Sequence, residues 1–170
     1  MQQQLTHEET FFTEQKFPIT LLCDGITYQP NIGSVFRICE AFGVAKVIFV
    51  GENIALTPRK INRTSRATHL QVPHQVAKLE EAITLLQGAK DNSEIIALEI
   101  TDKSKPLKDI SLNRNKPVVV IAGGEVNGIS EVLLKLANQT AHITMYGKNS
   151  SMNVVNAVGI ALYEITNKIS

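Results

Sequence analysis

The sequence predicts an α/β fold, a parallel sheet flanked by helices. The first indication is a set of short apolar runs rich in β-branched residues, which is typical of parallel strands buried on both faces. The second is the helical spacing of apolar residues in the segments between these runs. Strands that alternate with helices form a parallel sheet, because each helix returns the chain to the edge where the previous strand began.

Five runs are predicted to be buried strands. In chain order they are Ile19–Cys23, Lys46–Val50, Ile95–Ile100, Pro117–Ala122 and Ala141–Met145. A weaker sixth strand is expected through Leu70–Val72. Because the five runs are continuous rather than alternating, helices should cover both faces of the sheet.

Four helices are predicted from apolar residues at helical spacing. The first carries Ile32, Val35, Phe36, Cys39 and Phe42 and ends at Gly43; the second carries Leu79, Ala82, Ile83 and Leu86 and ends at Gly88; the third follows a Ser130 cap and carries Val132, Leu133, Leu136 and Ala137; the fourth carries Val154, Val158, Leu162 and Ile165. Glycine is expected at helix ends because it readily adopts a left-handed conformation.

The 170 residues are expected to form one domain at 19–170, preceded by an arm at 1–18. The arm is polar apart from Phe11 and Phe12, and a docked arm or a short helix is expected there. No basic segment followed by an apolar one opens the chain, and no apolar run approaches the ~20 residues that span a bilayer. A cytoplasmic protein without membrane contact is expected.

The net charge of +1 does not by itself indicate a nucleic-acid partner, so any such partner has to be argued from a local patch. The two cysteines, Cys23 and Cys39, lie in apolar runs and are interpreted as small buried side chains rather than a disulfide. Four scattered histidines, His7, His69, His74 and His142, do not indicate a metal site. The spacings of a P-loop, of G-x-G-x-x-G and of G-x-S-x-G are missing from the sequence.

Ligands of open α/β sheets bind at the carboxyl ends of the strands, so the residues after each predicted strand are candidates. The segment G-G-E-V-N-G-I-S follows Pro117–Ala122 and places Gly123, Gly124 and Glu125 there; a tight turn with a solvated glutamate is the alternative. The segment Y-G-K-N-S-S-M-N follows the last strand, and its amides could donate to a ligand anion. A helix capped by Ser150 or Ser151 is the alternative there.

Two further segments carry candidate residues. In Q-P-N-I-G-S-V-F-R, Asn31 could cap a helix and Arg37 lies near the face opposite the apolar stripe; a solvated surface arginine is the alternative. A basic segment without acidic residues contains Arg59, Lys60, Arg63 and Arg66. It could hold phosphates, because a guanidinium pairs well with phosphate oxygens, and a basic loop is the alternative.

Taken together, three segments resemble the motifs of SpoU/TrmH-type RNA 2′-O-methyltransferases of the SPOUT superfamily. They are N-I-G-S-V-F-R-I-C-E-A-F-G (31–43), I-A-G-G-E-V-N-G-I-S (121–130) and I-T-M-Y-G-K-N-S-S-M-N-V-V-N-A-V (143–158). The basic stretch R-K-I-N-R-T-S-R-A (59–67) also matches one in that family. The resemblance covers about residues 19 to 166, and its specificity comes from the order and spacing of the three motifs.

The resemblance implies a deep trefoil knot at the C-terminal end of the sheet, a homodimer, and S-adenosylmethionine bound bent in the loops of the knot. It assigns the cofactor to Leu98, Glu99, Gly123, Gly124, Glu125, Ile143, Met145, Ser151 and Met152. The chain departs from the pattern at Gly124, Thr144 and Met152, where the family often has Asn, Pro and Leu.

The resemblance further implies methyl transfer to a ribose 2′-hydroxyl without a metal. It assigns the reaction to Arg37, Asn31, Glu125, Ser151 and Asn153, with Arg37 reaching the cofactor site of the other subunit. Arg59, Lys60, Arg63 and Arg66 would bind the RNA backbone. Transfer RNA is the expected substrate, because the smallest members of the family act on it.

Three alternatives remain open. The same reaction on ribosomal RNA is the first, and a non-catalytic RNA-binding module of the same fold is the second. The third is a small-molecule methyltransferase with a Rossmann fold. Such enzymes carry their glycine-rich turn after the first strand, whereas Gly123 and Gly124 come late in this chain.

Overall fold

The structure is a computed structural model that describes residues 3–6, 9–10, 12–149 and 151–170. Within these ranges, seven strands form one sheet with the order β3-β2-β1-β6-β4-β7-β5. The strands are β1 Phe17–Asp24, β2 Val44–Val50, β3 His74–Ala77, β4 Glu94–Leu98, β5 Lys105–Pro106, β6 Val118–Gly123 and β7 Gln139–His142. Every pairing between these strands is parallel, so the predicted parallel sheet is confirmed.

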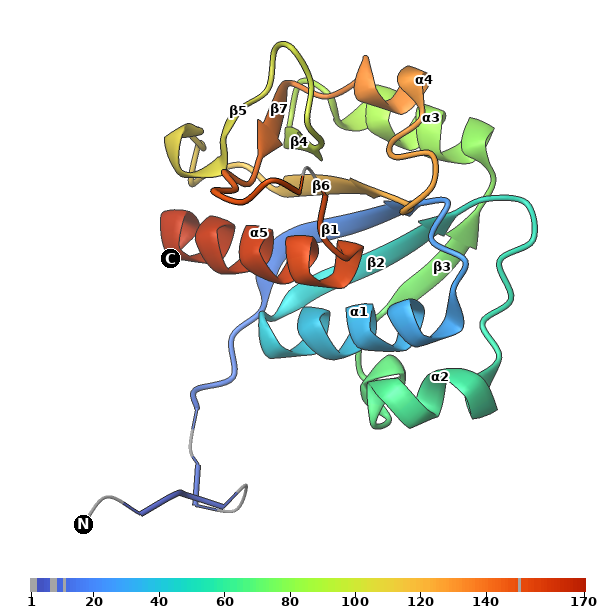
Figure 1. The fold of residues 1–170 in the computed structure, drawn as a ribbon, viewed down its shortest axis with the longest axis vertical. Coiled ribbons are helices and arrows are strands. Elements are labelled where there is room, and N and C mark those ends of the chain that lie inside the picture. The colour runs from blue at the N-terminus through green and yellow to red at the C-terminus, as the bar shows by residue number, and fades with distance from the viewer. Residues whose placement is uncertain (1–2, 7–8, 11, 150) are drawn as a thin grey trace.

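Helices cover both faces of the sheet (Figure 1). They are α1 Gln29–Ala41, α2 Pro58–Ser65, α3 Leu79–Ala89, α4 Glu131–Leu134 and α5 Val154–Ile169, with 3-10 turns at Thr68–Leu70 and Leu107–Asp109. One core lies between the sheet and helices α1 and α5, and the other lies under α3 and α4. Successive side chains of a strand point into the two cores alternately. Leu21 of β1 belongs to the first core and Leu22 to the second.

The predicted strand at Leu70–Val72 is wrong. A 3-10 turn occupies Thr68–Leu70, and the strand in this region, β3, begins at His74. β3 lies at the edge of the sheet, where Ala77 is its one buried residue. An edge strand is held by backbone hydrogen bonds more than by a buried side-chain row, so it lacks the apolar run that marked the central strands.

Helix α2 was not predicted, because its eight residues carry a single buried apolar side chain, Ile61. Two other helices differ from expectation at their ends. Helix α3 continues through Gly88 to Ala89, and α4 is a single turn with Ser130 at its N-cap position but without a cap hydrogen bond from the hydroxyl. Strand β4 ends at Leu98 rather than Ile100, and β7 covers Gln139–His142 rather than residues 141–145.

Residues 12–16, which precede β1, extend away from the sheet (Figure 1). β1 begins at Phe17, and residues 12–16 form neither helix nor strand. The Phe12 side chain is 89% exposed, so the described part of the predicted arm does not dock through this ring. Residues 1–2, 7–8 and Phe11 lie outside the described residues.

Both cysteines are free and buried, as predicted. Burial raises the pKa of the Cys23 and Cys39 thiols, which therefore stay neutral and act as small apolar side chains. Among the described helices, none combines the length and the apolar character that crossing a bilayer requires.

Helix α1 packs closely against α2 at Gly33. A Cβ atom there would overlap the Thr64 hydroxyl and lie 2.7 Å from the Ile61 carbonyl oxygen. Gly33→Ala is therefore expected to lower the free energy of unfolding by about 1–3 kcal/mol, as overpacking does. Urea denaturation measures this change.

The matched control is Gly88→Ala in α3, where no atom lies within 4 Å of the added Cβ. That variant should gain about 0.5–1 kcal/mol from helix propensity. Equal effects of the two substitutions would show that the contact between α1 and α2 is not tight at Gly33.

Candidate functional site

Three polar side chains from separate segments of the chain meet at the carboxyl end of the sheet. The Asn31 amide donates to Glu125 Oε1 at 3.0 Å, and the Asn153 amide donates to the same oxygen at 2.8 Å. Asn153 Nδ2 also lies 3.4 Å from Asn31 Oδ1. We call these three residues the polar triad. Each comes from a different one of the three segments singled out in the sequence.

Helix geometry places Asn31 and Asn153. The sequence indicated Asn31 as a possible cap of α1. In the structure Tyr28 is the N-cap residue, and Asn31 lies in the first turn of the helix. Its side chain is 9% exposed, and the bond to Glu125 satisfies its amide. Asn153, rather than Ser151, caps α5, because its Oδ1 accepts from the Val155 N–H at 2.9 Å. Ser150 lies outside the described residues.

The turn after β6 is held so that Glu125 points toward these amides. The Gly124 N–H donates to the Asp24 carbonyl oxygen at 2.7 Å, and the Gly128 N–H donates to the Gly124 carbonyl oxygen at 2.9 Å. A Cβ at position 124 would lie 2.6 Å from the Gly25 carbonyl oxygen. The larger residue expected from the family pattern would therefore require the backbone to move, which accounts for this departure.

A hollow of about 250 Å³ lies on one side of Glu125. We call it the knot-loop hollow, after the loops that the resemblance assigns to a knot. Its wall contains eight of the nine residues that the resemblance assigned to the cofactor: Leu98, Glu99, Gly124, Glu125, Ile143, Met145, Ser151 and Met152. The ninth, Gly123, lies beside it, where a Cβ would overlap the Gly128–Ile129 backbone. Sequence reasoning missed Ile100, Gly128, His142 and Ala157, which also line the hollow.

Glu99 ties two walls of the knot-loop hollow together. Its Oε1 accepts from the Ile100 N–H at 3.0 Å, and its Oε2 accepts from the Ile129 N–H at 3.1 Å. The loop after β4 is thereby joined to the loop after β6. This carboxylate shapes the hollow by accepting main-chain hydrogen bonds.

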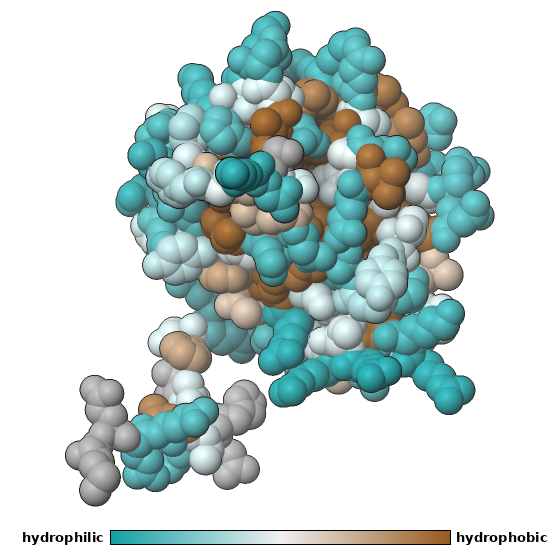
Figure 2. Space-filling model, viewed as in Figure 1, coloured by the Kyte–Doolittle hydropathy of each residue, from teal (hydrophilic) through white to brown (hydrophobic). Residues whose placement is uncertain are grey.

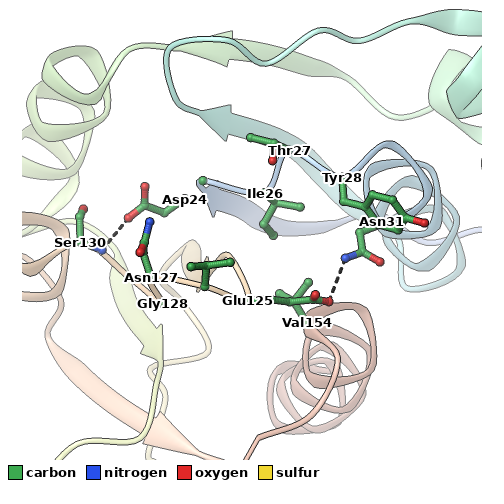
Figure 3. Close-up of a pocket in the computed structure, with 12 residues that line it drawn as sticks. Asp24, Ile26, Thr27, Tyr28, Asn31, Glu125, Asn127, Gly128, Ser130 and Val154 are labelled. Atoms are coloured by element: carbon green, nitrogen blue, oxygen red, sulfur yellow. Dashed lines mark hydrogen bonds between the residues drawn. The ribbon is translucent and has the colours of Figure 1, made fainter.

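Glu125 also lines a second hollow, of about 290 Å³, which is drawn in Figure 3. We call it the β1 hollow, because Asp24 and the loop that follows β1 form part of its wall. Glu125 and Gly128 line both hollows. Sequence reasoning did not select Asp24 or Tyr28, although the strand-end rule that selected Glu125 applies equally to the end of β1.

Arg37 does not join the polar triad within this chain. It is exposed on α1 and lines a third hollow, of about 530 Å³, together with Ser34, Arg63, Thr64 and Arg66. Six residues along a helix correspond to a rotation of about 240° around its axis, so Asn31 and Arg37 point in different directions. We call the three arginines the arginine cluster.

The basic residues predicted to bind RNA lie on and just after α2. Arg59, Lys60, Arg63 and Arg66 are all exposed, and the region of α2 is strongly hydrophilic in Figure 2. Arg66 and Ala67 have positive φ angles of 49° and 69°, which turn the chain sharply after the helix. The Asn62 side chain holds this turn by accepting from the Ala67 N–H at 3.0 Å.

Ser151 lines the knot-loop hollow and is not a member of the polar triad. Among the described residues, no group of three or more His, Cys, Asp or Glu side chains could hold a metal ion. The site thus combines a carboxylate held by two amides, two hollows that share it, and a separate arginine cluster.

The profile of the SpoU rRNA Methylase family matches residues 18–163. A tRNA (guanosine(18)-2′-O)-methyltransferase of Aquifex aeolicus is 26% identical over 148 residues, which are 86% of this chain and 67% of that protein. An uncharacterized tRNA/rRNA methyltransferase of Mycoplasma pneumoniae is 34% identical over 153 residues, 89% of this chain and 62% of its own length. The chain spans about half to two thirds of the length of such relatives.

Solved structures agree on the fold. An AdoMet-bound rRNA methyltransferase from Sinorhizobium meliloti superposes with a TM-score of 0.82 at 24% identity, covering 94% of this chain and 59% of that one. The A. aeolicus TrmH/SpoU tRNA modifying enzyme gives 0.78 at 23% identity, covering 91% and 77%. The fold is that of an α/β protein with a parallel sheet flanked by helices. The chain belongs to the SpoU rRNA methylase family.

Proposed function

We propose that this chain is an S-adenosylmethionine-dependent methyltransferase that acts on a ribose 2′-hydroxyl of RNA. The polar triad carries the proposal, because it places one carboxylate between two hollows. Relatives named as tRNA and 23S rRNA 2′-O-methyltransferases support the same reaction. With an RNA substrate, we expect the protein to act in the cytoplasm.

The knot-loop hollow suits S-adenosylmethionine. Leu98, Ile100, Ile143, Met145 and Met152 supply apolar contacts for an adenine ring, and the loop backbones supply hydrogen-bonding groups. Glu125 is a carboxylate in the same wall, which favours a sulfonium cation nearby. When bound, the cofactor would supply a methyl carbon for in-line attack by the ribose 2′-oxygen, with S-adenosylhomocysteine leaving as a neutral thioether and the hydroxyl proton passing to water.

Glu125 is the residue that orients the ribose. Both amides of the polar triad donate to its Oε1, which leaves Oε2 to accept a hydrogen bond from the sugar. Two donors on one oxygen also fix the rotamer of an otherwise exposed side chain. Alignment of the hydroxyl is the main contribution of this part of the site, since displacement at a sulfonium requires no metal.

Arg37 is proposed to act from a second copy of the chain in a homodimer. Within one chain it belongs to the arginine cluster and not to the polar triad. An exposed arginine can reach the site of a partner, where it binds an RNA phosphate and stabilises the alkoxide that develops on the 2′-oxygen. The exposed side chains Ile160 and Tyr163 on α5 offer apolar surface for the dimer.

The chain is further proposed to be knotted, with residues 19–170 forming the methyltransferase domain. Strand β7 lies between β4 and β5, and the segment after β7 lines the hollow before it enters α5. A backbone threaded in this way would hold the loop segments near Ile143 and Ser151 against each other. The resemblance to the SpoU/TrmH family supports this topology.

Transfer RNA is the proposed substrate. The A. aeolicus relative named for tRNA is matched over 67% of its length, against 52% for the Streptomyces azureus enzyme named for 23S rRNA. Ribosomal RNA is the second candidate, because several relatives are named for it. The arginine cluster, with Arg59 and Lys60, would bind the backbone of either RNA.

The test is a transfer assay with labelled S-adenosylmethionine on unmodified tRNA and on ribosomal RNA fragments. Label is expected in dinucleotides that resist alkaline hydrolysis, because a 2′-O-methyl group blocks cleavage at that position. Label in a base, or no label in either RNA, would refute the proposed function. A non-catalytic RNA-binding module would bind the RNA and transfer nothing.

Binding should depend on salt through the arginine cluster. Replacing Arg63 and Arg66 with glutamine is expected to reduce the slope of log K against log salt by about 0.7–0.9 per arginine that contacts a phosphate. Filter binding between about 50 and 200 mM salt measures the slope.

The control removes one positive charge elsewhere, against two in the double variant. Arg114 is exposed in the loop before β6, at the amino ends of the strands, whereas the polar triad lies at their carboxyl ends. Arg114→Gln should leave the slope unchanged. An equal change per charge removed would mean that net charge, and not the arginine cluster, governs RNA binding.

A further inference from the structure

The β1 hollow has no role in the function proposed so far. We propose that it holds the base of the nucleotide whose ribose is methylated, and that Tyr28 and Asp24 select that base. This inference rests on the proposed function. The hollow shares Glu125 and Gly128 with the knot-loop hollow. A ribose held at Glu125 would therefore have the methyl donor on one side and this space, large enough for a flat ring, on the other.

One end of the β1 hollow offers an apolar and aromatic surface. Ile26 and Val154 are buried in its wall, at 2% and 7% exposure, whereas Tyr28 is 65% exposed. Figure 3 shows Tyr28 and Val154 at the end where Asn31 and Glu125 meet. An exposed ring beside a buried apolar wall is suited to stacking, because every nucleobase has a flat π-face.

The other end of the hollow is polar. Asp24, Asn127 and Ser130 gather there (Figure 3). Asp24 Oδ2 accepts from the Ser130 N–H at 2.7 Å. In the described part of the chain, Ser130 Oγ is buried and has no hydrogen-bond partner. A buried hydroxyl without a partner destabilises the folded state, and the edge of a bound base would satisfy it.

The polar end favours some bases over others. A carboxylate only accepts hydrogen bonds, so the free oxygen of Asp24 would bind an exocyclic amino group. Guanine, adenine and cytosine carry such a group, and uracil does not. The substrate class inferred here is therefore a nucleotide with an amino-bearing base at the methylated position.

The first experiment measures kcat/KM for four transcripts that differ only in the methylated nucleotide. The wild-type chain should be slowest on the uridine transcript. Asp24→Asn keeps one oxygen for the Ser130 N–H and turns the other into a donor, so the preference should shift toward uridine by about tenfold. A purely structural role for Asp24 would lower all four rates equally, and that result would overturn the inference.

Tyr28→Ala should lower kcat/KM at least about fivefold through lost stacking, whereas Tyr28→Phe, which keeps the ring, should retain it. Equal rates for Tyr28→Ala and wild type would overturn the stacking role. Affinity for S-adenosylmethionine, measured by calorimetry, should be the same in all these variants, because Tyr28 and Asp24 lie outside the knot-loop hollow.

The second experiment does not depend on methyl transfer. Saturation-transfer NMR with AMP, GMP, CMP and UMP should show stronger transfer to base protons than to ribose protons, and the signal should disappear in Tyr28→Ala but not in Tyr28→Phe. Tyr28-dependent binding without methylation of any RNA would support the base site and refute the proposed function. Methylation without any effect of Tyr28 or Asp24 on base preference would support the function and refute the base site.

Discussion

Arg37→Ala is expected to lower methyl transfer at least about 1,000-fold, because the variant loses the cation that stabilises charge on the attacking oxygen. Affinity for S-adenosylmethionine should stay nearly unchanged, since Arg37 does not line the knot-loop hollow. Single-turnover rates and calorimetry measure the two quantities separately. Loss of both together would contradict the assignment of Arg37 to the reaction.

The same residue tests whether the site needs two chains. Arg37→Ala and Glu125→Gln are each expected to be inactive as pure proteins. Co-expressed in equal amounts, they should recover about one quarter of wild-type activity, because half of the dimers are mixed and each mixed dimer has one intact site. No recovery, with mixed dimers demonstrated by two affinity tags, would mean that Arg37 acts within its own chain.

Asn153→Ala is expected to impair both folding and reaction. The variant loses the cap of α5, which costs about 1 kcal/mol, as cap removal typically does. It also loses the amide that donates to Glu125 at 2.8 Å, and methyl transfer should fall about 10- to 100-fold, as expected for a hydrogen bond to a charged group. Thermal unfolding and single-turnover rates measure the two effects.

Asn153→Ser separates the two effects. Serine caps helices as well as asparagine does, so the stability of the folded state should be retained. The shorter side chain has no amide to donate to Glu125, so the loss of activity should remain. If Asn153→Ser regained full activity, Asn153 would serve only as a helix cap.

The central sheet could be predicted because burial on both faces requires continuous apolar runs, as in Val118–Gly123. The walls of the knot-loop hollow could be predicted from the resemblance, which assigned residues such as Leu98 and Met152 to them. Helix α2 could not, because polar residues dominate it and Ile61 alone anchors it.

The separation of Arg37 from the polar triad also could not be predicted from the sequence. Asn31 and Arg37 lie in one short motif, and only the rotation of the helix between them sends their side chains in different directions. The β1 hollow is a similar case. Tyr28 precedes α1 and Asn127 follows β6, so the two residues are about a hundred positions apart in the sequence. The hollow between them forms only when the folded chain places these two segments side by side.

The pairing of β1 with β6 has a consequence for synthesis on the ribosome. Leu21 pairs with Val120, so the inner edge of β1 stays bare until about a hundred further residues have emerged. During that interval the nascent β1–β2–β3 unit presents an apolar strand edge on which other chains can assemble. Slow elongation between codons 50 and 118 should therefore increase inclusion bodies, and a chaperone that shields this edge should reduce them.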